Sequence, residues 1–182
     1  DLAIRRADKK RVASITKSNA QGYGMVVWDR AFERISEQYP EIETESLLID
    51  AACMEFIRRP DSFDVVVGSN LFGDILTDIG GMITGSIGLS GSANIDPERR
   101  FPSMFEPVHG SAPDIAGKGI SNPIAAILSG AMMLNHLGHG KASMEIESAV
   151  IEVLTKGTAL TPDLGGKANT VEMGNTVVAA LN

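Results

Sequence analysis

The chain has a single cysteine, fewer basic than acidic residues and no long apolar run. Cys53 has no second thiol in the chain to pair with, so an internal disulfide is excluded. The formal net charge of -7 argues against nucleic acid or an anionic membrane as a partner, because both require a concentrated positive surface. No apolar run approaches the roughly 18 residues that a membrane span needs. We therefore expect a globular protein of a reducing, cytoplasmic environment.

The length and composition allow one sizeable core. The chain has 182 residues and 43% hydrophobic residues, enough for one domain or for parts of two. Residues 1–6 have the character of the end of a helix, without an initiator Met and without an N-terminal cap. We therefore expect the sequence to be a fragment of a longer protein.

Strand patterns alternate with helix patterns in the first half of the chain. Strands are predicted at residues 12–16, 46–49 and 63–68, and helices at 27–39, 51–58 and from Asn70 onward. This alternation predicts an α/β fold, in which sites gather at the carboxyl ends of strands. Lys17, Asp50 and Asn70 all fall at such ends. Residues 80–113 have a loop composition, and three further helices are predicted at 122–136, 143–156 and 170–181.

Two aspartates stand four residues apart on the helix predicted after Asn70. Asp74 and Asp78 would lie on one face, about one turn apart. A solvated acidic face is the common explanation for such a pair, but this helix is rich in apolar residues and is expected to be mostly buried. Unpaired carboxylates there would need a partner. With Asp50 as a third ligand, the oxygen donors suit Mg²⁺ or Mn²⁺.

A segment of small residues at 106–123 ends where a helix is predicted to begin. Small residues permit a ligand to approach the backbone closely, and Asp114 could accept the ribose hydroxyls of NAD while repelling the 2′-phosphate of NADP. The segment is neither a G-x-G-x-x-G fingerprint nor a P-loop. An ordinary surface loop therefore stays open as an alternative.

Five motifs together resemble one enzyme family, in order and spacing. They are Lys17-Ser18-Asn19, Leu48-Ile49-Asp50-Ala51, Asn70 to Ile75, Phe105 to Asn122, and Thr161 to Gly166. The chain resembles the isopropylmalate, isocitrate and tartrate dehydrogenases. Residues 18–21, 24–29 and 94–104 are most similar to tartrate dehydrogenase/decarboxylase, which also acts as a D-malate dehydrogenase. By this resemblance Asp163, inside the last motif, would approach adenine, although loop chemistry explains the residue nearly as well.

The resemblance implies a catalytic and metal-binding role for four residues. Lys17 and Asp50 would be catalytic, with Lys17 as the general acid/base, and Asn19 would lie beside substrate and nicotinamide. Asp50, Asp74 and Asp78 would hold Mn²⁺ or Mg²⁺, and Asp50 would reach into the partner subunit's site. The resemblance thus implies a homodimer with a shared active site.

The resemblance also implies how the cofactor and substrate bind. NAD is the expected cofactor, and a monovalent cation such as K⁺ is compatible with the family. The substrate would be a 2-hydroxy dicarboxylate, tartrate or D-malate, oxidised with loss of its β-carboxylate. The expected NAD contacts are Glu106, His109, Gly110, Ser111 and Ala112 at the nicotinamide and phosphate side, Asp114 at the ribose and Asn122 at adenine.

The implied fold is the two-domain isopropylmalate-dehydrogenase-like fold, of which this chain would supply the C-terminal portion of both domains. Residues 1–84 would belong to the smaller, dimer-forming and metal-binding domain, and residues 85–182 to the larger NAD-binding domain. The family's substrate-clamping arginines and catalytic tyrosine would lie upstream, so the fragment alone should be inactive. A 3-isopropylmalate or isocitrate dehydrogenase, a non-catalytic regulatory subunit and a purely structural α/β domain remain open.

Overall fold

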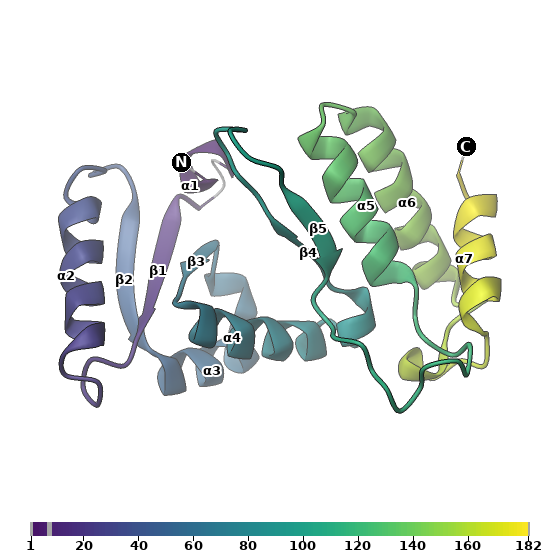
Figure 1. Cartoon of the computed structure of the whole chain (residues 1–182), viewed down its shortest axis with the longest axis horizontal. Helices are drawn as coiled ribbons and strands as arrows, with labels where there is room; N and C mark the ends of the chain where they lie inside the picture. The colour runs from purple at the N-terminus through teal and green to yellow at the C-terminus, as the bar shows by residue number, and fades with distance from the viewer. Residues whose placement is uncertain (1, 7–8, 182) are drawn as a thin grey trace. The chain divides into compact units, whose positions relative to one another are not determined.

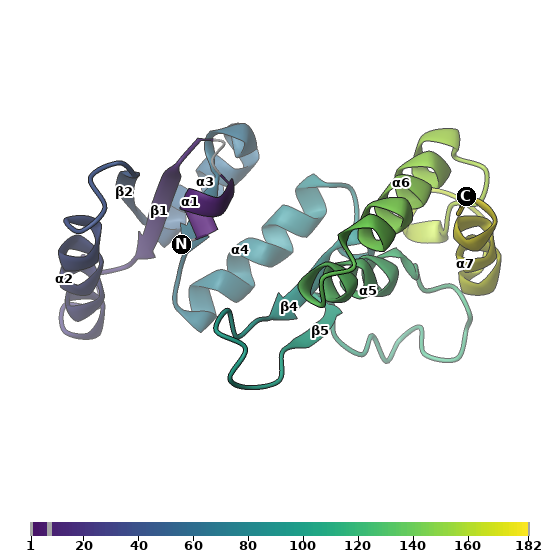
Figure 2. The same cartoon turned by 90° about the horizontal axis from the view of Figure 1, so that it is seen from above.

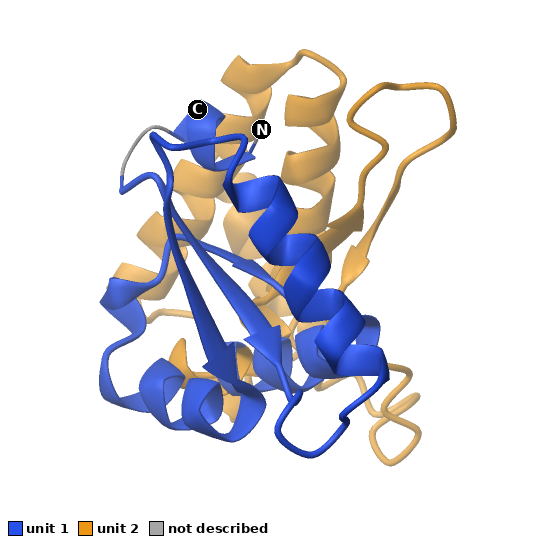
Figure 3. Ribbon diagram, turned by 90° about the vertical axis from the view of Figure 1, so that its left-hand side faces the viewer, with its two compact units in different colours: residues 1–80 blue, residues 81–182 orange. Residues whose placement is uncertain are grey.

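In the computed structural model, which describes residues 2–6 and 9–181, the chain divides into two units at residues 80 and 81 (Figure 3). The division lies four residues before the predicted one, inside helix α4 (Asn70–Ile83). The assignment of these units to a smaller and a larger domain stays a prediction. Because no described helix combines the length and apolarity of a membrane span, none could cross a bilayer.

A three-stranded parallel sheet organises unit 1 (Figure 1). Strand β1 (Arg11–Thr16) lies at the centre, between β2 (Glu43–Leu48) and β3 (Val65–Val67). Val12 faces Thr44 on one side and Val65 on the other, and both pairings are parallel. A parallel pair needs a crossover, which α2 (Gly24–Ser36) and α3 (Ile49–Arg58) supply. The predicted α/β fold is confirmed.

The core of unit 1 lies between β1 and the helices. Ile15 and Ala52 are fully buried, and Met25, Phe72 and Leu76 complete the buried cluster. Cys53 packs against this cluster, as expected of a small apolar residue. Trp28 also packs there, and its indole N–H donates to Ser14 Oγ at 2.9 Å, which satisfies its polar atom.

Several element boundaries in unit 1 differ from the prediction by a few residues. Helix α2 ends at Ser36 rather than Tyr39, because the backbone N–H groups of residues 38 and 39 turn back to Ile35 and Ser36 before Pro40. The predicted helical end at the N-terminus is present as α1 (Leu2–Arg6), while Asp1 lies outside the described residues.

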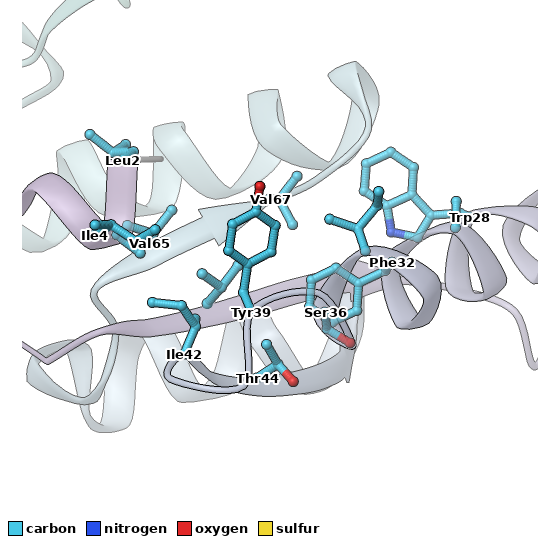
Figure 4. A pocket seen from close by; sticks show the side chains of 14 residues that line it. Leu2, Ile4, Trp28, Phe32, Ser36, Tyr39, Ile42, Thr44, Val65 and Val67 are labelled. Atoms are coloured by element: carbon cyan, nitrogen blue, oxygen red, sulfur yellow. The ribbon is translucent and has the colours of Figure 1, made fainter.

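An apolar groove with a volume of about 590 Å³ runs over one face of this sheet (Figure 4). Side chains of α1, α2 and all three strands line it, together with Tyr39 and Ile42 from the turn before β2. Its lining consists of Leu2, Ala3, Ile4, Val12, Trp28, Ala31, Phe32, Ile35, Ser36, Tyr39, Ile42, Thr44, Val65 and Val67. No predicted site residue belongs to this lining, so the groove is not the predicted catalytic site.

Unit 2 combines a two-stranded antiparallel sheet with three helices (Figure 2). Strands β4 (Gly91–Asn94) and β5 (Met104–Pro107) pair with each other, and α5 (Ile124–His136) packs on both strands and lies beside α6 (Gly140–Lys156). Helix α7 (Thr170–Ala179) contacts α6. The buried cluster comprises Ile124, Ala149, Val150, Val153, Met173 and Val177. The three predicted helices are confirmed.

The prediction of loop structure for residues 80–113 is partly wrong. Helix α4 continues to Ile83, a 3-10 turn spans Ile87–Leu89, and two strands follow. The sequence of β4, Gly-Ser-Ala-Asn, contains no β-branched or aromatic residue. A Cβ on Gly91 would lie 3.0 Å from the backbone N of Ser129, so β4 is held by its close approach to α5 rather than by its own propensity.

Candidate active site

Lys17 and Asp50 form an ion pair at the carboxyl edge of the parallel sheet. Lys17 directly follows β1, and Asp50 lies in the first turn of α3, directly after β2. Parallel strands bring these two ends to the same edge, and Lys17 Nζ lies 2.5 Å from Asp50 Oδ1. The hydrogen bond from Lys17 holds the pKa of the Asp50 carboxyl below its ordinary value. The pair is open to water, since the Asp50 side chain is 62% exposed.

Asn19 lies in the tight turn that follows Lys17. The backbone N–H groups of Ala20 and Gln21 both donate to the Lys17 carbonyl, at 3.0 and 2.8 Å. This turn fixes the backbone around Lys17, and it leaves the side chain of Asn19 exposed. Lys17 and Asn19 are therefore close along the chain at one edge of the sheet, as the sequence predicts.

Asp74 and Asp78 lie one turn apart on an exposed face of α4. Within the described residues, neither carboxylate takes part in an ion pair. Leu71 and Ile75 occupy the same face by their spacing and are 61% and 41% exposed. The expectation of a mostly buried helix is wrong for this chain, because only Phe72 and Leu76 of α4 are buried apolar residues. Burial therefore gives no argument for a metal here, but two free carboxylates one turn apart still fit a hard divalent cation.

The three aspartates predicted to bind metal do not gather within one chain. No group of three or more His, Cys, Asp or Glu side chains positioned to bind a metal occurs in the described part of the chain. Asp50 is paired with Lys17, while Asp74 and Asp78 share the face of α4. The chain thus presents two half-sites, one of Lys17 with Asp50 and one of Asp74 with Asp78.

The predicted nucleotide loop follows β5 in unit 2. Glu106 is an exposed residue of β5, and His109 is half-buried with Nδ1 3.0 Å from the Gly110 carbonyl. Ser111, Ala112 and Asp114 are exposed. The loop turns through left-handed conformations at Ala112 (φ 42°), Gly117 (φ 77°) and Gly119 (φ 66°). An exposed backbone of small residues with one free carboxylate fits the adenosine and phosphates of a dinucleotide.

Asn122, predicted to contact adenine, is buried at the end of this loop. Its side-chain Oδ1 accepts from the Ile124 N–H at 3.0 Å, and Nδ2 donates to Asp163 Oδ2 at 2.9 Å. Both polar atoms of the side chain are therefore engaged inside the protein. The contact with adenine stays a prediction.

Asp163 and Ser86 form a polar cluster with Asn122 that the sequence did not reveal. Ser86 Oγ donates to Asp163 Oδ2 at 2.5 Å, although the two residues are 77 positions apart. Partial burial alone would raise the pKa of Asp163, but hydrogen bonds led by the one from Ser86 hold it below its ordinary value. The motif Thr161 to Gly166 marked the position of Asp163, whereas nothing in the local sequence marked Ser86.

The chain is similar to known proteins along nearly its whole length. The sequence profile of the isocitrate/isopropylmalate dehydrogenase family matches residues 1–177. The D-malate dehydrogenase [decarboxylating] of Escherichia coli is 50% identical over 93% of this chain and 48% of its own length. The tartrate dehydrogenase/decarboxylase of Pseudomonas putida is 48% identical over 96% of this chain and 49% of its own length. The chain thus spans about half the length of these relatives.

A solved structure shares the fold. The crystal structure of isocitrate dehydrogenase from Methylococcus capsulatus superposes with a TM-score of 0.91 and is 41% identical. The match covers 97% of this chain and 52% of that one. The parallel sheet and the helices described above are therefore those of a known dehydrogenase fold.

Proposed function

Because the chain belongs to the isocitrate/isopropylmalate dehydrogenase family, we propose that the protein carrying it oxidises tartrate or D-malate with NAD and removes the β-carboxylate. The Lys17–Asp50 pair at the edge of the sheet is the observation that carries this proposal. A non-catalytic subunit would have no need to hold a lysine against a carboxylate at this edge.

The residues of this chain have distinct tasks in the proposed reaction. The neutral amine of Lys17 accepts the proton of the substrate hydroxyl, and as ammonium it later returns a proton to the enolate, while Asp50 holds Nζ in place at 2.5 Å. Asp74 and Asp78 offer free oxygens for Mn²⁺ or Mg²⁺. When bound, the divalent cation would polarise the C–O bond of the substrate, and NAD would accept the hydride.

The loop of unit 2 is proposed to bind NAD rather than NADP. Asp114 is exposed and carries the negative charge that favours free ribose hydroxyls over a 2′-phosphate. Residues 109–112 are proposed to line the nicotinamide and phosphate side together with Glu106. A requirement for K⁺ and a cytoplasmic location stay predictions.

Oxidation of tartrate or D-malate can be tested directly. NADH production is measured with Mn²⁺ and, in parallel, D-malate, tartrate, 3-isopropylmalate and isocitrate. Activity on D-malate or tartrate is expected. Asp74→Asn should lower this activity at least about a hundredfold, because it replaces a negatively charged carboxylate, proposed to bind the metal, by a neutral amide. The matched control is Asp61→Asn, which changes another exposed aspartate of unit 1 and should retain activity.

Activity on isocitrate alone would favour the second candidate, an isocitrate dehydrogenase, which the 41% identity to the Methylococcus capsulatus enzyme supports. Metal-independent activity, or none with any of the four acids, would overturn the proposed site.

A homodimer with a shared site is the proposed assembly. Helices α3 and α4 each expose pairs of large apolar side chains at helical spacing, Met54 with Ile57 and Leu71 with Ile75. Since Asp74 and Asp78 share the face of Leu71 and Ile75, the metal carboxylates border this apolar surface. A second copy packed here would bring its own Lys17–Asp50 pair toward those carboxylates, which would join the two half-sites.

Ile57→Glu is expected to convert the dimer to a monomer and to abolish activity, because it places a charge in the proposed interface. Light scattering after size-exclusion chromatography measures the mass. Ile151→Glu changes an equally exposed isoleucine of α6 and should leave both the mass and the activity unchanged. A fully active monomer in the unaltered protein would contradict the shared site.

A further inference from the structure

Residues 161–170 hold the carboxyl end of the predicted nucleotide loop, residues 106–123, at three points. Asp163 Oδ2 accepts from Asn122 Nδ2 at 2.9 Å. The backbone N–H of Thr170 donates to the Gly119 carbonyl at 2.8 Å, and Thr170 Oγ1 donates to the Ser121 carbonyl at 2.5 Å. Three residues near the end of the loop, Gly119, Ser121 and Asn122, are thus tied to residues 41 to 51 positions further along the chain.

Asp163 fixes which way the carboxamide of Asn122 points. The carboxylate can only accept hydrogen bonds, so it turns the amide nitrogen of Asn122 toward itself and the amide oxygen toward Ile124. That oxygen then receives one of the free N–H groups at the start of α5. The orientation of Asn122 and the start of α5 therefore both depend on Asp163.

The surrounding packing leaves little freedom at this point. A Cβ on Gly88 would lie 2.8 Å from Asn122 Cβ and 3.1 Å from Asp163 Oδ2. Ser86 Oγ donates to the same carboxylate oxygen, Asp163 Oδ2, and also accepts from the Gly88 N–H at 3.0 Å. Asn122 itself is 6% exposed. One oxygen of the Asp163 carboxylate thus accepts from two donors, Asn122 and Ser86, beside a closely packed junction.

The rest of the loop has weaker support. Residues 110–114 and 116–121 are exposed, and the backbone hydrogen bonds described within the loop span single turns, from Ile115 to Ala112 and from Lys118 to Ile115. A short exposed loop with such local bonds opens easily unless its ends are fixed. Its arrangement therefore relies on the anchors at residues 119–122.

We propose that Asp163 is a positioning residue for the adenosine end of the NAD site, acting through Asn122 and the loop end rather than by touching the cofactor. This inference rests on the proposed function, because it assumes that the loop binds NAD. In the cofactor-free protein, the carboxylate keeps residues 119–122 in the arrangement that the dinucleotide requires, so that binding does not have to order them.

Asp163→Ala tests the proposal in the whole protein with two independent measurements. Hydrogen–deuterium exchange in the absence of NAD should become about tenfold faster for amides of residues 119–124, because Asn122 loses the partner that orients it. The KM for NAD should rise about tenfold while kcat changes less than twofold, since the loss concerns binding and not the reacting atoms. Asp163→Asn, which keeps one oxygen acceptor, should restore most of both properties.

Asp96→Ala is the matched control. Asp96 also belongs to unit 2 and accepts backbone N–H groups from Glu98, Arg100 and Phe101, but none from the loop. This variant should alter neither the exchange of residues 119–124 nor the KM for NAD. If Asp163→Ala does not fold, Thr170→Val, which removes only the hydroxyl bond to Ser121, gives the same test with a smaller expected effect of about threefold.

Unchanged exchange at residues 119–124, or faster exchange with an unchanged KM, would overturn the positioning role. Faster exchange in a protein whose unaltered form shows no NAD-dependent activity would instead overturn the proposed function, because the anchor would then exist without a dinucleotide to position.

Discussion

Lys17→Ala is expected to lower kcat about 10² to 10⁴-fold, with a smaller change in the KM for NAD. The ammonium of Lys17 is the proposed proton carrier at the sheet edge, and the Asp50 carboxylate beside it can only accept protons at neutral pH. Alanine removes the carrier and leaves Asp50 in water, where its charge needs no partner. NADH production with Mn²⁺ and D-malate measures the effect, and circular dichroism checks that the fold is unchanged.

Lys156→Ala provides the control for this substitution. Lys156 ends α6 and pairs with Glu152 on an exposed helix face, so it also loses an ion pair on replacement. Its activity should match that of the unaltered protein. A Lys17→Ala variant that retains more than about a tenth of kcat would show that another group transfers the proton.

Gly166→Ala is expected to lower the free energy of unfolding by about 3 kcal/mol, an effect at the upper end of those seen for overpacked sites. An added Cβ would lie 1.8 Å from the Leu160 carbonyl oxygen, which is backbone and cannot turn away. The substitution must therefore shift the turn that Gly166 and Ala168 close through hydrogen bonds to Thr161 and Leu160. Urea unfolding monitored by circular dichroism measures the change.

Gly174→Ala is the matched control, since a Cβ on Gly174 meets nothing within 4 Å. This residue lies inside α7, where alanine is the better helix former by up to about 1 kcal/mol. The control should be as stable as the unaltered protein or more stable. Equal stability of the two alanine variants would show that the Leu160–Gly166 turn adjusts without cost.

The alternation of strands and helices was predictable because β1 and β3 are rich in β-branched residues and parallel strands require long crossovers. Val12, Ile15, Val65 and Val67 carry this pattern in their own sequence. Strand β4 was not predictable, because the reason for its conformation lies in α5, which approaches Gly91 closely. Local propensity therefore predicted the elements that form on local grounds, and failed where tertiary contact decides.

In the candidate site, too, the features set by local sequence were predictable and those set by tertiary contact were not. Helical spacing placed Asp74 and Asp78 on one face, and strand ends placed Lys17 and Asp50 at one edge. The apolar residues of α4 were interpreted as core, although Leu71 and Ile75 are exposed, because apolar composition alone does not show whether a helix face is buried within the chain. The contact between Ser86 and Asp163 could not be predicted, since no periodicity relates residues 77 positions apart.

The pairing of β1 has a consequence for the order in which unit 1 can form. Each of its two neighbours lies beyond at least one complete helix along the chain, and no two strands of the sheet are joined by a hairpin. Closing such long loops costs conformational entropy before any ladder hydrogen bond compensates for it. In unit 2, by contrast, β4 and β5 pair across a short connection, and α5 and α6 follow each other directly. The edge that carries Lys17 and Asp50 needs the pairing of β1 with β2, so the proposed catalytic pair can form only once the crossover through α2 has closed.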